Sequence, residues 1–411
     1  MPSALPTGDP PPPDGRLSRT TLDAAFGVPF GAYVHVPFCE TRCGYCDFNT
    51  YTSAELPGIS RGTYADTVLQ EIRLAADVLT DGDALGDRIP PLTSIFFGGG
   101  TPTLLPAEHL GLIIREITDR FGLAEDVEIT TEANPETVTP GYFHRLREAG
   151  FTRVSLGMQS AVPKVLAVLD RTHRAGRPEA AVAEARAAGF EHVNLDLIYG
   201  APYETDADWE QSLRAAVAAG PDHISAYALV VEQGTALARQ VSAGVVPAPD
   251  DDVAADRYVM ADEILGAAGY EWYEVSNWAR GQRAACRHNE LYWSDANWWG
   301  FGPGAHSHVS GVRWWNVKHP TRYAAALEAG RSPAAGRETL DPAARYTEKI
   351  MLGVRMRAGL PTYELTEHAR ASLPQLASWG LIDTGLMNVG QVVLTQRGRL
   401  MADAVVRELL S

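Results

Sequence analysis

The chain has few cysteines and no long hydrophobic run. Only 4 of its 411 residues are cysteine, and no apolar stretch is long enough to cross a bilayer. Residues 1–16 are rich in proline and lack the apolar core of a secretory signal. These absences argue against a disulfide framework and an exported protein, so we expect a soluble protein in the reduced compartment of the cytoplasm.

Positive charge is also scarce. Lysine and arginine number 35 against 51 aspartate and glutamate residues, which gives a net charge of −16. A chain this acidic repels phosphates, so we expect no nucleic acid partner and a small substrate instead. The length predicts more than one domain and a core large enough to exclude water from a reactive site.

Three of the four cysteines stand together. Cys39, Cys43 and Cys46 have the spacing C-x3-C-x2-C. Four thiolates normally hold a [4Fe-4S] cluster, so three on one loop leave an iron open to an outside ligand. A structural zinc site usually has two C-x2-C pairs, and a disulfide framework needs paired cysteines. Cys286 lies far downstream and remains a candidate fourth thiolate.

Beyond Gly31, short β-rich runs alternate with segments of helical spacing, a pattern typical of a parallel sheet with helices outside. Apolar residues between the first two strands recur at helical intervals through residues 68–79. The sequence therefore predicts an α/β fold, a partial (β/α)6 barrel with its chemistry at the carboxyl ends of the strands. The predicted strands are residues 33–36, 93–97, 127–131, 153–157, 193–197 and 224–229.

Glycine and polar motifs follow these strands. Gly99, Gly100 and Thr101 come after the second strand, where missing side chains let a ligand approach the backbone. Glu132 ends the third strand and can accept hydrogen bonds, although capping the next helix is its ordinary role.

Two further strand ends carry polar groups. Gln159 ends the fourth strand and Asp196 lies in the fifth, where each suits a ribose hydroxyl. Between them, Arg171 can pair with a carboxylate, or form only a surface salt bridge. Each of these residues alone is weak evidence for a ligand site. Their order along the chain makes the evidence stronger.

The cysteine run resembles the signature loop of the radical-SAM superfamily. From Gly31 onward the chain resembles the branch that contains oxygen-independent coproporphyrinogen III oxidase and the HemW-like haem chaperones. The matching motifs begin at Tyr33, Gly98, Leu156 and Asp196. The resemblance implies a [4Fe-4S] cluster on the three cysteines and S-adenosylmethionine as cofactor. The implied cofactor contacts are Tyr33, Tyr45, Gly99, Gly100, Thr101, Glu132, Gln159, Arg171 and Asp196, with Val230 as a further candidate.

Phe48 separates the two relatives. The cysteine run of the oxidases resembles C-x3-C-x2-C-x-C. In this chain Phe48 stands at the position of the additional cysteine. A phenyl ring lacks the redox and hydrogen-atom chemistry of a thiol. The chain therefore resembles the haem chaperones more closely, and its status as an enzyme is left open.

A second motif points the same way. Residues 287–293 contain H-N-x-x-Y-W, which resembles the haem-binding segment of the chaperones. A neutral imidazole is a good axial ligand for haem iron, so His288 is the expected ligand. A histidine among aromatics is also often a hydrogen-bonded core residue. Cys286, His306 and His308 are the rival ligands.

The C-terminal region has a different character. Helical segments at residues 346–354 and 373–379, a hairpin through 381–394 and a terminal helix resemble the small winged-helix-like α+β domain of the oxidases. We expect it to cover the barrel mouth or to dock a partner. The predicted domains are a disordered proline-rich tail (1–27), the barrel (28–240), an extension with the haem-binding segment (241–332) and this domain (333–411).

These observations favour a haem chaperone that uses the cluster and S-adenosylmethionine. The resemblance implies haem, haem-accepting respiratory proteins and a reductant such as flavodoxin or ferredoxin as partners, with transient contact to a membrane. The alternative is a coproporphyrinogen III oxidase that decarboxylates propionate side chains by radical chemistry. A third alternative is an iron-sulfur protein on the same barrel without radical chemistry.

Overall fold

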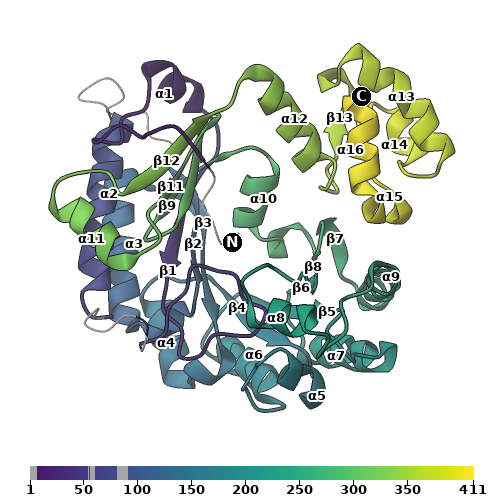
Figure 1. The fold of residues 1–411 in the computed structure, drawn as a ribbon, viewed down its shortest axis with the longest axis horizontal. Helices are drawn as coiled ribbons and strands as arrows, with labels where there is room; N and C mark the ends of the chain where they lie inside the picture. The colour runs from purple at the N-terminus through teal and green to yellow at the C-terminus, as the bar shows by residue number, and fades with distance from the viewer. Residues whose placement is uncertain (1–6, 54, 56–60, 81–90) are drawn as a thin grey trace.

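The computed structural model describes residues 7–53, 55, 61–80 and 91–411 (Figure 1). Its largest element is a sheet of twelve strands. The strands are β1 (Phe30–Val36), β2 (Leu92–Gly99), β3 (Leu123–Ala133), β4 (Arg153–Gln159), β5 (His192–Tyr199), β6 (His223–Ala228), β7 (Glu271–Glu274), β8 (Asn277–Ala279), β9 (Asn297–Phe301), β10 (His306–Val309), β11 (Val312–Asn316) and β12 (Ala334–Thr339).

Strands β1 to β6 lie side by side in chain order, and each pairs with the next in parallel. All six predicted strands are present. Only Leu229 of the predicted ranges falls outside, because β6 ends at Ala228. The partial barrel is therefore confirmed, and the carboxyl ends of its strands meet along one edge.

The sheet continues past both edges of the predicted barrel. On one side β9 pairs in parallel with β1 and leads to antiparallel β10, β11 and β12. On the other side β8 and β7 add to β6 as antiparallel strands. Residues 241–332 thus supply strands to both ends of one sheet, which keeps β1 and β6 from being exposed edges.

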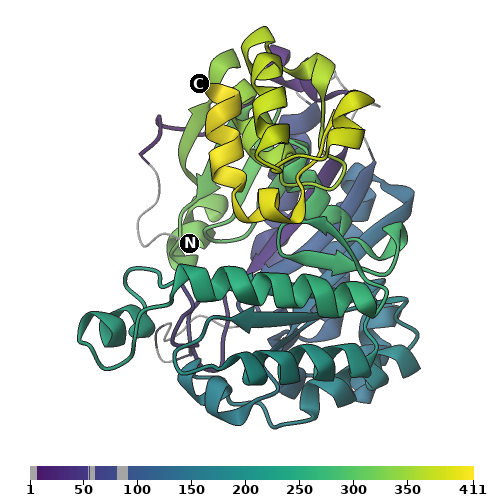
Figure 2. The ribbon, with the colours of Figure 1, turned by 90° about the vertical axis from the view of Figure 1, so that its right-hand side faces the viewer.

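Helices cover the outer side of the sheet (Figures 1 and 2). In the helix between β1 and β2, the apolar positions Val68, Ile72 and Leu79 are buried, as the helical spacing predicted. None of the helices in the described part of the chain has both the length and the apolar character that a bilayer crossing requires. The helices before residue 330 are α1 (Arg19–Ala25), α2 (Tyr64–Thr80), α3 (Ala107–Phe121), α4 (Pro140–Glu148), α5 (Pro163–Val168), α6 (Arg177–Ala187), α7 (Asp206–Ala219), α8 (Ala236–Ser242), α9 (Asp251–Ala267), α10 (Arg287–Trp293) and α11 (Pro320–Glu328).

The expected disordered tail is wrong for residues 7–27. Asp9 exchanges two backbone hydrogen bonds with Arg337 of β12, at 2.8 and 2.9 Å. Leu17 and Leu22 are buried in the main core, and Ser18 caps α1. The proline content predicted disorder. Proline lacks a backbone N–H group, but an extended segment along the edge of a sheet does not need a donor at every position, so prolines are compatible with it. Residues 1–6 lie outside the described residues.

Residues 342–411 form a C-terminal unit with a core of its own, which includes Ile350, Leu376 and Val405. Its helices confirm the predicted helical segments. The elements are α12 (Pro342–Gly353), α13 (Glu367–Ser378), α14 (Thr384–Asn388), α15 (Gln396–Leu400), α16 (Ala402–Leu410), β13 (Leu360–Pro361) and β14 (Gln391–Val392).

Three details of the C-terminal unit differ from expectation. The predicted hairpin is reduced to one bridge between Ile382 and Leu394, because α14 fills the interval and β14 pairs with β13. The unit begins after residue 333, since β12 belongs to the large sheet. It also does not cover the barrel mouth, because none of its residues lines the cavity described below.

An arginine anchors the C-terminal unit to the barrel. Arg399 of α15 donates to both carboxylate oxygens of Asp262 on α9, at 2.9 and 2.6 Å. Its guanidinium also lies 4.4 Å from the ring centroid of Trp272. Trp278 donates to the same carboxylate at 2.9 Å. In both views the unit stands beside α9 (Figures 1 and 2).

We expect Arg399→Ala to lower the free energy of unfolding by about 2–3 kcal/mol, because it leaves the Asp262 carboxylate without its cation. Urea denaturation followed by tryptophan fluorescence measures this loss. Arg397→Ala is the matched control, since Arg397 is an exposed residue of the same helix. Equal effects of the two substitutions would contradict an anchoring role for Arg399.

Candidate functional site

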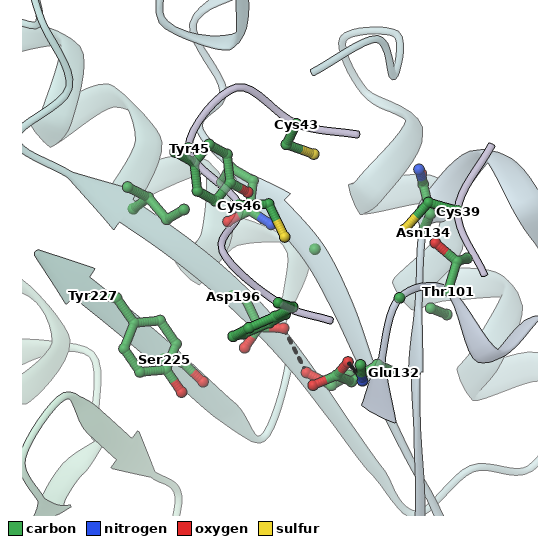
Figure 3. Close-up of a pocket in the computed structure, with 18 of the residues that line it drawn as sticks. Cys39, Cys43, Tyr45, Cys46, Thr101, Glu132, Asn134, Asp196, Ser225 and Tyr227 are labelled. Carbon is green, nitrogen blue, oxygen red and sulfur yellow. Dashed lines mark hydrogen bonds between the residues drawn. The ribbon is translucent and has the colours of Figure 1, made fainter. Parts of the chain in front are cut away.

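A cavity of about 710 Å³ lies inside the partial barrel and extends to the carboxyl ends of the strands, and each strand from β1 to β6 contributes to its wall (Figure 3). The structure brings every predicted cluster, cofactor and haem residue to this one cavity, although they span more than half of the chain. They are Tyr33, Cys39, Cys43, Tyr45, Cys46, Gly99, Gly100, Thr101, Glu132, Gln159, Arg171, Asp196 and His288, and Val230 joins them.

The three cysteines lie on the loop that follows β1. Figure 3 shows their sulfur atoms turned toward a shared space, and all three are free thiols. Cys46 N donates to Cys43 O at 3.2 Å and closes a tight turn, while Cys39 N donates to Tyr51 O at 3.0 Å. Three thiolates can therefore face one cluster while both of these backbone hydrogen bonds stay in place.

Burial favours the neutral thiol at Cys39 and Cys46. It raises the pKa of Cys39 to about 11, and it also raises the pKa of Cys46. Arg171 contributes a cation, since its Nη1 donates to Cys43 Sγ at 3.5 Å. In the described part of the chain, no three His, Cys, Asp or Glu side chains converge closely enough for a single metal ion. Three free thiols on one loop are the donor type that an iron-sulfur cluster uses, and binding of iron would displace their protons.

The glycine motif packs against the cysteine loop. Gly100 N donates to Val36 O at 2.8 Å and Thr101 N donates to Phe38 O at 2.7 Å. Gly99 has φ +107°, and a Cβ there would lie 2.6 Å from the His35 ring. A Cβ on Gly100 would collide with Phe38 O. The absence of side chains at Gly99 and Gly100 thus lets the cysteine loop pack closely against this motif, and both glycines also line the cavity.

Two carboxylates lie in the cavity wall. Glu132 accepts from Gly99 N at 3.1 Å, and burial with the neighbouring charge of Asp196 raises its pKa to about 8. Asp196 accepts from Ser155 at 2.6 Å and from Asn194 at 2.7 Å, and burial raises its pKa as well. A cationic ligand would stabilise the charged form of both carboxylates.

Gln159 and Arg171 stand at the end of β4 and in the loop beyond it. Gln159 has φ +62°, a left-handed backbone that turns its side chain into the cavity wall. Arg171 donates to Gly157 O at 2.9 Å, while its Nε is buried without a partner. Arg171 is therefore held in place with donor capacity to spare.

His288 lies in the cavity wall near the amino ends of β1 and β2, on α10. Its Nδ1 is 2.9 Å from Ser94 Oγ and its Nε2 is 2.8 Å from Tyr292 Oη. The ring stacks on Phe96 with centroids 5.0 Å apart, and burial lowers its pKa to about 3. The imidazole is therefore neutral, and one hydrogen bond must break before it can ligate a metal.

The rival ligands occupy different places. Cys286 also lines the cavity, where its Sγ lies 3.4 Å from Glu128 Oε1. His306 and His308 do not line it. His308 Nδ1 lies 2.9 Å from Ala296 O, and its Nε2 accepts from Gly311 N at 2.9 Å. The geometry thus leaves His288 and Cys286 as the candidates inside the cavity.

Phe96, Ser225 and Tyr227 are among the wall residues that sequence reasoning missed. Phe96 forms an aromatic wall with His288, Ser225 lies beside Asn194, and Tyr227 faces the cavity from β6 (Figure 3). The signal was period-two alternation, which puts His223, Ser225 and Tyr227 on one face of β6. An aromatic or hydroxyl side chain carries no motif, so only the alternation could have identified these residues.

Comparison with known proteins agrees with this geometry. The model of the Radical SAM superfamily matches residues 33–216. Coproporphyrinogen III oxidase (HemN) from Escherichia coli superposes with a TM-score of 0.78 over 97% of this chain and 94% of that chain. The two sequences are 22% identical, so this likeness establishes the fold alone.

Two curated relatives share more of the sequence. A Bacillus subtilis (strain 168) protein named Heme chaperone HemW is 31% identical over 91% of this chain and 97% of its own length. A Mycobacterium tuberculosis (strain H37Rv) protein of the same name is 53% identical over 93% of this chain and 95% of its own length. Since this likeness extends over nearly the whole of both chains, the protein belongs to the HemW family of the Radical SAM superfamily.

Proposed function

We propose that this protein is a cytoplasmic haem chaperone that carries a [4Fe-4S] cluster, binds S-adenosylmethionine and haem, and delivers the haem to haem-requiring respiratory proteins. The main support is the 53% identity to a relative named Heme chaperone HemW. The cavity adds independent support, because it combines three free thiols with buried carboxylates and aromatic rings. A reductant such as flavodoxin or ferredoxin is part of the proposal.

In this proposal Cys39, Cys43 and Cys46 hold the cluster, and the cavity wall holds S-adenosylmethionine. A cluster held by these three thiolates, with one iron open, would supply the electron for cleavage of the sulfonium bond of the cofactor. Glu132 accepts from the amino group of the cofactor, Asp196 and Gln159 bind its ribose, and Arg171 pairs with its carboxylate. The contacts with Tyr33, Tyr45, Gly99, Gly100, Thr101 and Val230 are proposed on the same resemblance.

The alternative function, oxidation of coproporphyrinogen III, has less support. The E. coli oxidase shares the fold at 22% identity, and fold does not imply function. Phe48 stands where the oxidases have their additional cysteine, and its ring lines the cavity. The site therefore lacks the thiol chemistry of that position.

The cluster assignment predicts that serine substitutions lower the iron content at some cysteines and not at others. Serine at Cys39, Cys43 or Cys46 removes a thiolate ligand, so we expect the anaerobically reconstituted variant to lose most of its iron and sulfide. Cys286→Ser is the matched control, because Cys286 is also a free cysteine of the cavity but lies outside the loop. Iron analysis and Mössbauer spectroscopy measure the outcome. Iron loss in Cys286→Ser alone would contradict the assignment.

The raised pKa of Glu132 predicts pH-dependent cofactor binding. Below its pKa of about 8 the carboxyl is protonated, and a cationic cofactor must displace that proton. We expect affinity for S-adenosylmethionine to rise up to about tenfold per pH unit from pH 6.5 and to level off above pH 8. Calorimetry measures this against Glu132→Gln, which keeps the shape and removes the titration. Parallel pH profiles of the two proteins would contradict the role of Glu132.

The chaperone function itself is tested by haem binding and transfer. Haem titrated anaerobically into the reconstituted protein should bind and then move to a haem-free globin, while coproporphyrinogen III with reductant and cofactor stays unchanged. Release of protoporphyrinogen would overturn the proposal. We propose His288 as the axial ligand, with Nε2 released from Tyr292 when haem binds.

His288→Ala should therefore weaken haem binding at least tenfold and shift the Soret band. Tyr292→Phe should strengthen it about fivefold, because a competing hydrogen bond of about 1 kcal/mol is gone. His306→Ala, outside the cavity, is the control. Unchanged spectra in His288→Ala would move the axial role to Cys286.

A further inference from the structure

The cysteine loop is closed at its base. Tyr51 N donates to Pro37 O at 2.7 Å, and Cys39 N donates to Tyr51 O at 3.0 Å. The three cysteines therefore stand on a closed loop of residues 37–51, which begins where β1 ends. Loops with paired ends keep a shape of their own, but other contacts have to fix their position relative to the barrel.

Asn49 supplies such contacts from the base of the loop. Its side chain is 7% exposed, and its Nδ2 donates to Pro303 O and to Lys318 O, both at 2.9 Å. Its Oδ1 accepts from the hydroxyl of Tyr51 at 3.1 Å. Both ends of the amide thus have partners. Asn49 does not line the cofactor cavity, so these contacts lie behind its wall.

The two carbonyls that accept from Asn49 belong to the part of the sheet beyond β1. Pro303 lies between β9 and β10, and Lys318 lies between β11 and α11. Gly304 N donates to Val317 O at 3.0 Å, which keeps the two segments together. Because β9 pairs in parallel with β1, both carbonyls have a fixed position relative to the barrel.

The Asn49 amide packs closely against this support. Gly304 has φ +77°, and a Cβ there would lie 2.6 Å from Asn49 Nδ2. A side chain at this position would therefore displace the amide. The backbone oxygen of Asn49 lies 2.9 Å from Nε2 of the buried His35 in β1. Since a carbonyl oxygen only accepts, Nε2 is the donor, and it ties the base of the loop to β1 as well.

None of residues 297–318, all of which the structure describes, lines the cavity. These residues form β9 to β11 and the turns between them, and their contact with the cysteine loop runs through Asn49. We propose that Asn49 is a positioning residue for the cluster: it fixes the cysteine loop to the support formed by β9 to β11. The three thiols are then held in place before iron binds, which lowers the entropic cost of binding. The proposal rests on the proposed function, in which these thiols hold a cluster.

The first test compares two glycines of the same backbone class. Gly304→Ala and Gly330→Ala both place alanine at a positive φ, but nothing lies within 4 Å of a Cβ at Gly330. In reconstituted protein we expect a chelator to remove iron about tenfold faster from Gly304→Ala and from Asn49→Ala, because two hydrogen bonds of the amide are lost. Gly330→Ala, which carries the backbone strain alone, should stay within about twofold of the parent protein. Equal rates in the two alanine variants at glycine positions would overturn the proposal.

The second test needs no cluster. In the apoprotein we expect hydrogen exchange at the amides of Cys39 and Tyr51, which close the loop, to be about tenfold faster in Asn49→Ala. Arg399→Ala is the control for a general loss of stability, since Arg399 lies in the C-terminal unit, and it should leave these amides as protected as in the parent. Unchanged protection in Asn49→Ala would overturn the proposal. A parent protein that takes up no cluster iron would instead overturn the proposed function, while the exchange measurement would still test the role of Asn49.

Discussion

The site depends on backbone pairing that continues beyond the ends of two neighbouring strands. β1 and β2 pair in parallel, and after they end Gly100 still donates to Val36 and Thr101 to Phe38. These bonds hold the start of the cysteine loop against the glycine motif. Since a side chain on Gly100 would collide with the Phe38 carbonyl, the contact is possible only without a Cβ. The cluster loop and the glycine motif therefore form one structure, and neither is placed without the other.

Electrostatics then divides the cavity. Glu132 and Asp196 are buried in the wall, where burial raises the pKa of both and the charge of Asp196 raises that of Glu132 further, whereas Arg171 lies at the cysteine loop and donates to Cys43. A ligand with a positive centre, hydroxyls and a carboxylate satisfies all of these groups together. Phe48, Tyr227 and Val230 add apolar side chains to the same wall, so one cavity presents both charged and apolar groups to a ligand.

A shared fold does not determine function. The E. coli oxidase superposes over almost the whole chain at 22% identity, and Phe48, which stands where the sequence resemblance implies a cysteine in the oxidases, lines the cavity. A ring at that position removes one chemistry and supplies an apolar contact. The C-terminal unit, which Arg399 anchors to α9, contributes no residue to the wall of the cavity.

The local pattern of the sequence determined much of this protein. The spacing of Cys39, Cys43 and Cys46, the six apolar strands and the polar residues at their ends are periodic or contiguous, and periodicity follows from backbone geometry alone. Tertiary structure alone decided that His288 would have both nitrogens bonded, that β9 would pair with β1, and that Leu17 would join the core. Each of these joins residues far apart in the chain, and such contacts depend on which surfaces pack together, a choice that no local spacing encodes.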